Sequence, residues 1–263
     1  MKKPLTKSQV AFYRKNGYLF VPKLFPPKEI RAIDREVEKL VLEDKPSVIK
    51  EHDGKTVRSV LNAHLYSPII DWLCRSERVV APVMQLLDRP VYIFQSIVNV
   101  KRAFDGAQWT WHQDYPTYKI DDKMPEPRAV NVMIFIDDVN EFNGPLMIVP
   151  GTQKFKVKIG DVDTSVTPYP HGRYPSVDWV KPAMAGKGIV APKGPAGSVI
   201  FMDIMAVHGS GPNMSPWHRN IMSLTLNAVD NKATGTVRGP SICHDYTPVQ
   251  PLPVKALGAA MRA

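Results

Sequence analysis

Two histidines and an aspartate have the residue types and spacing of a mononuclear metal site. His112 and Asp114 form a His-X-Asp pair where a predicted strand gives way to a loop, and His208 follows 96 residues after His112. Two imidazoles and one carboxylate on one face of an octahedral ion leave positions open for a cosubstrate and O₂, as in non-haem Fe(II) oxygenases. We therefore predict that His112, Asp114 and His208 bind Fe(II).

An arginine near the second histidine extends this pattern. Arg219 lies eleven residues after His208, and its planar guanidinium can bind a carboxylate through two hydrogen bonds. A keto acid that chelates iron needs such a partner for its free carboxylate. Each residue alone is a weak signal, because a His-X-Asp pair occurs by chance and a single arginine usually lies at the surface. Together they predict Fe(II), 2-oxoglutarate and O₂.

The first third of the chain is predicted to be mostly helical. Residues 6–17 form a first helix with Thr6 or Ser8 near its cap, and residues 18–21 form a short strand. Pro26 and Pro27 open a second helix, since proline is tolerated in the first turn. Its predicted buried stripe is Ile30, Ile33, Val37, Leu40 and Val41. A third helical region covers residues 68–87, with Trp72, Val79, Val83 and Leu87 in the core.

From residue 90 onward the sequence predicts strands. Residues 91–100, 130–136, 146–149, 198–202 and 222–228 are short β-rich or apolar runs separated by Gly, Pro and Asn. This pattern is typical of a sandwich or barrel, and the fold class is mainly β with flanking helices. We expect adjacent strands joined by a turn to place His208 and Arg219 side by side. Residues 155–196 lack a clear period and are expected to form a lid or binding loop.

Composition limits the remaining function classes. The 263 residues are expected to form one domain. The sequence contains no run of about 18 apolar residues, the length needed to span a membrane. Two distant cysteines predict unpaired thiols and a cytoplasmic location. The net charge of +9 is spread along the chain without a basic block, which argues against nucleic-acid binding. The partner is expected to be a small-molecule substrate, and the oligomeric state stays open.

Several motifs resemble one known family. The chain resembles the phytanoyl-CoA dioxygenase superfamily, and within it the branch of the ectoine hydroxylases. His208 to Arg219, at a separation of eleven, belongs to the specific part of this resemblance. The other motifs are residues 12–19 (FYRKNGYL), 57–60 (VRSV), 95–101 (QSIVNVK), 111–114 (WHQD) and 143–151 (NGPLMIVPG).

The resemblance implies a fold and a division of the chain. The implied fold is a double-stranded β-helix (jelly roll, cupin-like) with flanking helices. Residues 1–88 would be a mostly helical buttress, and residues 89–231 the jelly-roll core with 155–196 as a lid-like insertion. Residues 232–263 would be a C-terminal tail.

The resemblance also implies roles for the site residues. His112, Asp114 and His208 would hold Fe(II), and Arg219 would bind the distal carboxylate of 2-oxoglutarate. Residues at the positions of Lys101 and Ser210 help to hold this cosubstrate, and Gln95 lies at the pocket. The implied reaction releases succinate and CO₂ and hydroxylates the substrate. Halogenases of the superfamily have a small residue in place of the carboxylate, so Asp114 favours hydroxylation.

The substrate is less well defined. Ectoine hydroxylases have Trp where this chain has Tyr118, and Asn and Phe where it has Ile221 and Ser223. We predict that these residues, with Gln95, line the substrate pocket and that the substrate is a small polar, amino-acid-like metabolite other than ectoine. An anionic molecule such as an aminoalkylphosphonate is the alternative. Two other classes stay open, a non-oxygenase metal protein on a cupin-like barrel and a non-enzymatic binding barrel.

Overall fold

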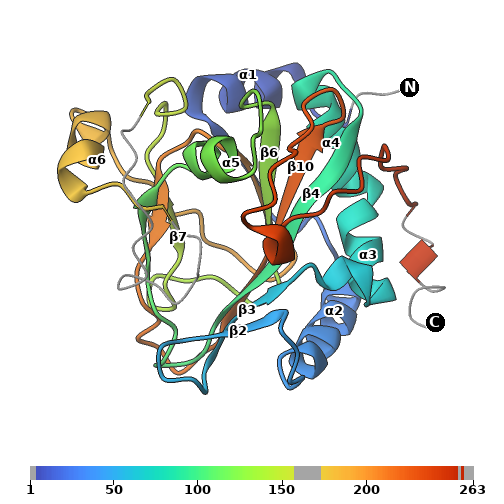
Figure 1. Ribbon diagram of the computed structural model, residues 1–263. Coiled ribbons are helices and arrows are strands. Elements are labelled where there is room, and N and C mark those ends of the chain that lie inside the picture. The colour runs from blue at the N-terminus through green and yellow to red at the C-terminus, as the bar shows by residue number, and fades with distance from the viewer. Residues whose placement is uncertain (1–3, 157–172, 254–255, 258–263) are drawn as a thin grey trace.

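Two antiparallel sheets form the centre of the protein in the computed structural model, which describes residues 4–156, 173–253 and 256–257 (Figure 1). Within these residues the larger sheet has seven strands and the smaller has three. The larger sheet has the order β1 (Tyr18–Val21), β8 (Val199–Asp203), β6 (Ala129–Phe135), β10 (Arg219–Ala228), β4 (Val91–Lys101), β3 (Val57–Leu61), β2 (Val48–Lys50). The smaller has the order β5 (Trp109–His112), β9 (His208–Ser210), β7 (Leu146–Ile148).

The inner faces of the two sheets pack against each other. Met133, Ile200 and Ile221 from the larger sheet share a buried cluster with Leu146 and Ile148 from the smaller one. Side chains of a strand alternate between its faces, so each strand supplies every second residue to this core. Two facing antiparallel sheets with a common core are the architecture that the predicted jelly roll requires.

Helices cover the other face of the larger sheet. They are α2 (Pro27–Leu40), α3 (Pro68–Arg75) and α4 (Glu77–Leu87), which lie to the right of the sheet in Figure 1. The predicted stripe of α2 is buried as expected, with Ile33 and Val37 fully enclosed. It packs in one cluster with Val98 and Leu224, which lie on the outer face of the sheet. The larger sheet is therefore buried on both faces.

The helical region predicted over residues 68–87 is two helices. Ser76 has φ −54° and ψ 132°, which ends α3 before α4 begins. The C-terminal segment runs past this break, where the Glu77 N–H donates to the Leu252 carbonyl and the Leu252 N–H donates to Arg75. These contacts satisfy backbone groups that a continuous helix would have paired internally. Leu87, predicted to be core, is only half-buried.

The N-terminal segment supplies both edges of the larger sheet. Helix α1 (Lys7–Asn16) begins at Thr6, whose hydroxyl accepts from the Gln9 N–H in a capping box, as predicted. Gly17 ends the helix with a left-handed φ of 76°, and β1 follows directly and pairs with β8. At the opposite edge β3 pairs with β4 and β2 pairs with β3. The mostly helical first 88 residues thus also extend the sheet.

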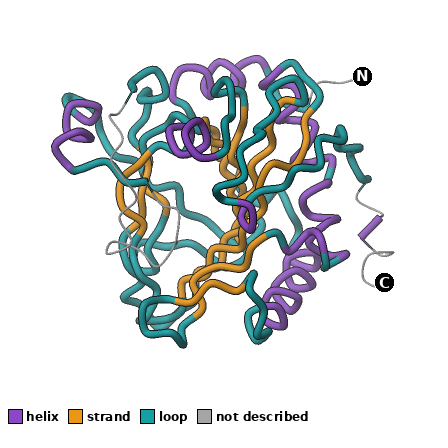
Figure 2. Tube along the Cα trace, viewed as in Figure 1, coloured by secondary structure: helices purple, strands orange, loops and turns teal. Residues whose placement is uncertain are grey.

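The remaining helical elements are short and lie at separate places around the two sheets (Figure 2). They are α5 (Tyr115–Asp121), α6 (Val177–Met184) and the 3₁₀ turns η1 (Ala63–Leu65) and η2 (Gly239–Ser241). Residues 157–172 of the predicted lid lie outside the described residues, so its closure stays a prediction. Cys74 and Cys243 are free thiols, as expected. Among the described helices, none is long and apolar enough to cross a bilayer.

Candidate metal and cosubstrate site

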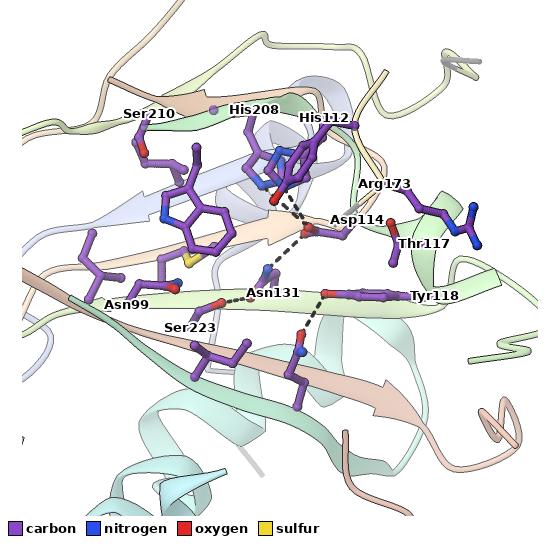
Figure 3. A pocket seen from close by; sticks show the side chains of 18 of the residues that line it. Asn99, His112, Asp114, Thr117, Tyr118, Asn131, Arg173, His208, Ser210 and Ser223 are labelled. Carbon is purple, nitrogen blue, oxygen red and sulfur yellow. Dashed lines mark hydrogen bonds and ion pairs between the residues drawn. The ribbon is translucent and has the colours of Figure 1, made fainter. Parts of the chain in front are cut away.

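The smaller sheet and the turn after it bring the three predicted metal ligands together. His112 on β5 and His208 on β9 are direct cross-strand partners, and their ring centroids lie 4.2 Å apart. Asp114 follows β5 at the start of α5, where its backbone N–H donates to the Ile204 carbonyl at 3.0 Å. The three ligand atoms lie within 4.8 Å of one another, and all three side chains line one pocket (Figure 3).

The backbone orients both imidazoles toward Asp114. The Nδ1 of His112 contacts the Thr110 carbonyl at 2.6 Å, and the Nδ1 of His208 contacts the Ala206 carbonyl at 3.0 Å. A carbonyl only accepts hydrogen bonds, so each Nδ1 carries a proton and Nε2 is the ring nitrogen that is left to bind a metal. These Nε2 atoms lie 3.4 Å and 3.7 Å from Oδ1 of Asp114. Three electron-pair donors that converge in this way fit a divalent cation.

The charge states agree with this fit. Burial lowers the pKa of His208 to about 4, and the neighbouring His112 adds to the shift, so His208 is neutral at pH 7. Burial opposes ionisation of Asp114, but His208, His112 and the Asn131 amide outweigh it and lower its pKa to about 2. The site therefore offers two imidazoles and one carboxylate, the ligand set of a facial triad.

Arg219 faces this site from the opposite sheet. The prediction that His208 and Arg219 lie on adjacent strands is wrong, because β9 belongs to the smaller sheet and β10 to the larger one. The two strands are consecutive in the chain, but the segment between them crosses from one sheet to the other. Both residues nevertheless line the same pocket. The two side chains therefore line the pocket from opposite sheets, and the pocket lies between these sheets.

The guanidinium of Arg219 fits an anionic ligand. Arg219 is 3% exposed, and its Nε has no hydrogen-bond partner among the described residues. Burial lowers its pKa to about 9, Asp137 opposes this shift and Arg58 adds to it, so the group remains charged at pH 7. A buried cation with an unpaired donor is costly. A carboxylate in the pocket would remove this cost through paired hydrogen bonds.

Lys101 and Arg58 are buried basic residues close to Arg219. Lys101 is the cross-strand partner of Arg219, and its Nζ donates to the Gly211 carbonyl. It is 1% exposed, so it is not a surface strand residue, yet it is not among the residues that line the pocket. Burial, together with the cations of Arg219 and Arg58, lowers its pKa to about 5, so Lys101 is largely neutral at pH 7. Lys101 therefore lies next to the pocket and does not line it, and its role in binding the cosubstrate stays a prediction.

The other predicted pocket residues all lie in the wall. Ser210 is on β9, and Ile221 and Ser223 alternate on β10 with Arg219, so the three β10 side chains share the inner face. Tyr118 on α5 donates its hydroxyl to Oε1 of Gln95 at 3.2 Å. Gln95 in turn donates to the Ser241 carbonyl at 3.0 Å. Helix, sheet and C-terminal segment thus meet at one side of the pocket.

Two buried or half-buried ion pairs at the end of α5 are pocket features that the motifs did not indicate. Arg173 binds Asp121 through Nε and a terminal nitrogen, with distances of 2.8–3.1 Å. Arg238 binds Asp122 in the same way, and both arginines line the pocket. The partners are 52 and 116 residues apart in the chain, so no local spacing could have revealed them.

Asn131 is the other residue that the motifs missed. It is a single polar residue in the apolar run Val130–Ile134 and lies on the pocket face of β6. This interruption of the apolar run could have indicated a buried hydrogen bond, because a polar residue in a strand buried on both faces needs a hydrogen-bond partner. Its partner, Asp114, belongs to another element and is known only from the tertiary structure.

Comparison with known proteins gives one family model and several related hydroxylases. Residues 13–221 match the phytanoyl-CoA dioxygenase (PhyH) family. An L-proline trans-4-hydroxylase from Streptomyces griseoviridis is 33% identical, covering 95% of this chain and 96% of the relative. An ectoine dioxygenase from Bordetella parapertussis is 34% identical, covering 86% of this chain and 77% of the relative.

Solved structures of one protein, EctD from S. alaskensis, are similar over most of the chain. The structure with 2-oxoglutarate and 5-hydroxyectoine has a TM-score of 0.78 and 29% identity, and covers 88% of this chain and 79% of EctD. The structure with bound Fe has a TM-score of 0.78 and 27% identity, with coverage of 89% and 80%.

Proposed function

The chain belongs to the phytanoyl-CoA dioxygenase family and is an Fe(II)- and 2-oxoglutarate-dependent dioxygenase, and we propose that it hydroxylates a small free amino acid. One observation carries this proposal. The pocket joins three converging metal-ligand atoms, a buried arginine with an unpaired donor and a polar wall within one set of lining residues. Iron supplies the oxidation chemistry when it is bound, and the protein supplies orientation and exclusion of water.

Each site residue has a proposed role. His112, Asp114 and His208 hold Fe(II) through two Nε2 atoms and Oδ1. Arg219 binds the distal carboxylate of 2-oxoglutarate, Ser210 contacts the same cosubstrate, and Lys101, the cross-strand partner of Arg219, helps to hold that end of it. The convergence of the three lone pairs and the unpaired Nε of Arg219 support these roles.

The opposite part of the pocket is proposed to select the substrate. Gln95, Tyr118, Ile221 and Ser223 form its wall, and Arg173 and Arg238 place guanidinium groups near it. Guanidinium and amide groups suit the carboxylate of an amino acid. The proline hydroxylase matches this chain over nearly its full length, whereas the ectoine dioxygenase is covered to 77%. L-Proline is therefore the first substrate to test.

A panel experiment tests the substrate class. The purified protein with Fe(II), 2-oxoglutarate and O₂ should release succinate in proportion to hydroxylated product with L-proline or a closely related amino acid. Ectoine should react at least about tenfold more slowly, the scale by which a changed apolar pocket contact discriminates. Coupled turnover of ectoine as the best substrate would contradict the proposal.

Two substitutions test the pocket wall separately. Tyr118→Trp and Ile221→Asn should each change the ratio of kcat/KM between two substrates by about tenfold or more. The affinity for Fe(II) and the KM for 2-oxoglutarate should stay near the unmodified values, because neither side chain contacts the ligand atoms. A loss of cosubstrate binding with unchanged selectivity would move both residues out of the substrate wall.

The product is expected to be hydroxylated even in high chloride. Asp114 would take the coordination position that a halide needs, and the cosubstrate and O₂ would use the positions that the triad leaves open. With ¹⁸O₂, one labelled atom should enter the product and one should enter succinate. Mass spectrometry distinguishes the outcomes, and a chlorinated product from the unmodified protein would exclude this role of Asp114.

A small anion such as an aminoalkylphosphonate is the second candidate substrate. The arginines in the pocket wall and the net charge of +9 support it. The same panel distinguishes the two candidates, because an aminoalkylphosphonate substrate would give faster coupled succinate release than L-proline. The non-oxygenase and non-enzymatic alternatives are set aside by family membership together with the triad. We also propose a cytoplasmic location, which the two free thiols support.

A further inference from the structure

A buried asparagine connects the pocket wall to the proposed metal ligand Asp114. Asn131 on β6 is 3% exposed, and its Nδ2 donates to Oδ2 of Asp114 at 3.0 Å. Its Oδ1 accepts from the hydroxyl of Ser223 on the neighbouring strand β10, also at 3.0 Å. Figure 3 shows the three side chains in a row, with Asn131 between the other two. They form a hydrogen-bonded chain from the wall to the metal site.

The chemistry of the three groups fixes the direction of this chain. An ionised carboxylate only accepts hydrogen bonds, so Asn131 must present its NH₂ group to Asp114. The amide oxygen then faces Ser223, whose hydroxyl donates to it. Because Oδ2 of Asp114 is engaged by the amide, Oδ1 is the oxygen that faces Nε2 of both histidines, at 3.4 Å and 3.7 Å.

We propose that Asn131 is a positioning residue that holds Asp114 so that only Oδ1 is presented to the metal, and that Ser223 holds Asn131 in this orientation. A carboxylate bound through both oxygens would take one more coordination position. The cosubstrate and O₂ need the positions that a facial triad leaves open. Hydrogen bonds that orient metal ligands typically change metal affinity or activity by about 10- to 100-fold.

The chain also connects the substrate wall to the metal. Ser223 lines the pocket, so a ligand that takes its hydroxyl proton changes the bond that orients Asn131. A change in the hydrogen bonding of Ser223 can thereby alter the orientation of Asp114 through two hydrogen bonds. This inference rests on the proposed ligand role of Asp114, and it is independent of which substrate the enzyme accepts.

Metal binding without turnover tests the inference. Mn(II) is titrated calorimetrically into the full-length, metal-free protein without 2-oxoglutarate or substrate. Asn131→Leu keeps a similar side-chain size and removes both hydrogen bonds, so Mn(II) should bind about 10- to 100-fold more weakly. Asn99→Leu is the matched control, because Asn99 lines the same pocket but bonds to Ser59 instead of a ligand. Its Mn(II) affinity should stay near that of the unmodified protein.

A second pair of variants removes only the outer hydrogen bond. Ser223→Ala should weaken Mn(II) binding by about two- to tenfold, the range expected for one hydrogen bond. Ser223→Thr keeps the hydroxyl and should bind Mn(II) as the unmodified protein does. A role in packing alone would lower the melting temperature without this difference between Ala and Thr. If Asn131→Leu does not fold, the Ser223 pair decides.

The outcomes separate this inference from the metal-site assignment. Unchanged Mn(II) affinity in folded Asn131→Leu, or in Ser223→Ala if only that variant folds, would overturn the inference. Asp114→Ala, measured alongside, should lose Mn(II) binding. If Asp114→Ala binds Mn(II) normally, the ligand assignment itself fails. If Asp114→Ala loses binding while Asn131→Leu does not, only the positioning role fails.

Discussion

Replacement of His112, Asp114 or His208 by alanine is expected to abolish turnover while the protein remains folded. Each change removes one of three ligand atoms that lie within 4.8 Å of one another, and two protein ligands cannot hold the metal in the same geometry. The fold should survive because the pairing of β5 with β9 uses backbone groups. None of the three side chains belongs to the hydrophobic clusters of the core.

Succinate release and hydroxylated product measure turnover, and circular dichroism with thermal melting measures folding. His52→Ala is the control, because His52 is an exposed histidine outside the pocket and its loss should leave turnover unchanged. Full activity in a folded variant of any triad residue would remove that residue from the metal site. The three variants should also lose Mn(II) binding, which separates a loss of metal from a loss of substrate.

Substitution of Arg219 by lysine is expected to raise the KM for 2-oxoglutarate by about 10- to 100-fold. Hydrogen bonds to charged groups contribute about 1.5–3 kcal/mol, and each 1.4 kcal/mol corresponds to a factor of ten. Lysine keeps the charge but lacks the planar fork that binds a carboxylate through two bonds. The substitution removes the guanidinium of Arg219, a pocket-lining group whose Nε has no hydrogen-bond partner among the described residues.

The KM for the hydroxylated substrate should change much less than the KM for 2-oxoglutarate. Binding of 2-oxoglutarate to the Mn(II)-loaded protein gives the same comparison without turnover. Arg128→Lys is the matched control, because Arg128 forms a half-exposed ion pair with Asp230 outside the pocket. An unchanged KM for 2-oxoglutarate in Arg219→Lys would show that another group binds the distal carboxylate.

Local sequence signals predicted the elements well where neighbouring residues decide the structure. Thr6 caps α1 because its hydroxyl reaches an N–H three residues away, and the apolar spacing of α2 matches its buried face. The break at Ser76 was missed, since the backbone groups there are paired with the distant C-terminal segment around Leu252. A contact with a distant segment leaves no periodic pattern at the position that it alters.

The sequence by itself determined which chemistry the proposed metal site can have. The residue types of His112, Asp114, His208 and Arg219 restrict the site to a cation held by imidazole and carboxylate, beside a partner for an anion. Ligand chemistry depends on side-chain type, which can be read directly. Tyr118, Ile221 and Ser223 line this pocket, and their contact with the substrate stays a prediction.

Only the tertiary structure decided how these groups face one another. It placed His208 and Arg219 on opposite sheets, paired Arg173 and Arg238 with neighbouring aspartates of α5, and put Asn131 against Asp114. The physical reason is that these contacts join segments brought together by sheet packing. Hydrogen bonds and ion pairs form over about 3 Å in space whatever the separation along the chain. The proposed metal ligands could therefore be predicted from the sequence. The groups that orient them could be identified only from the packing of the two sheets.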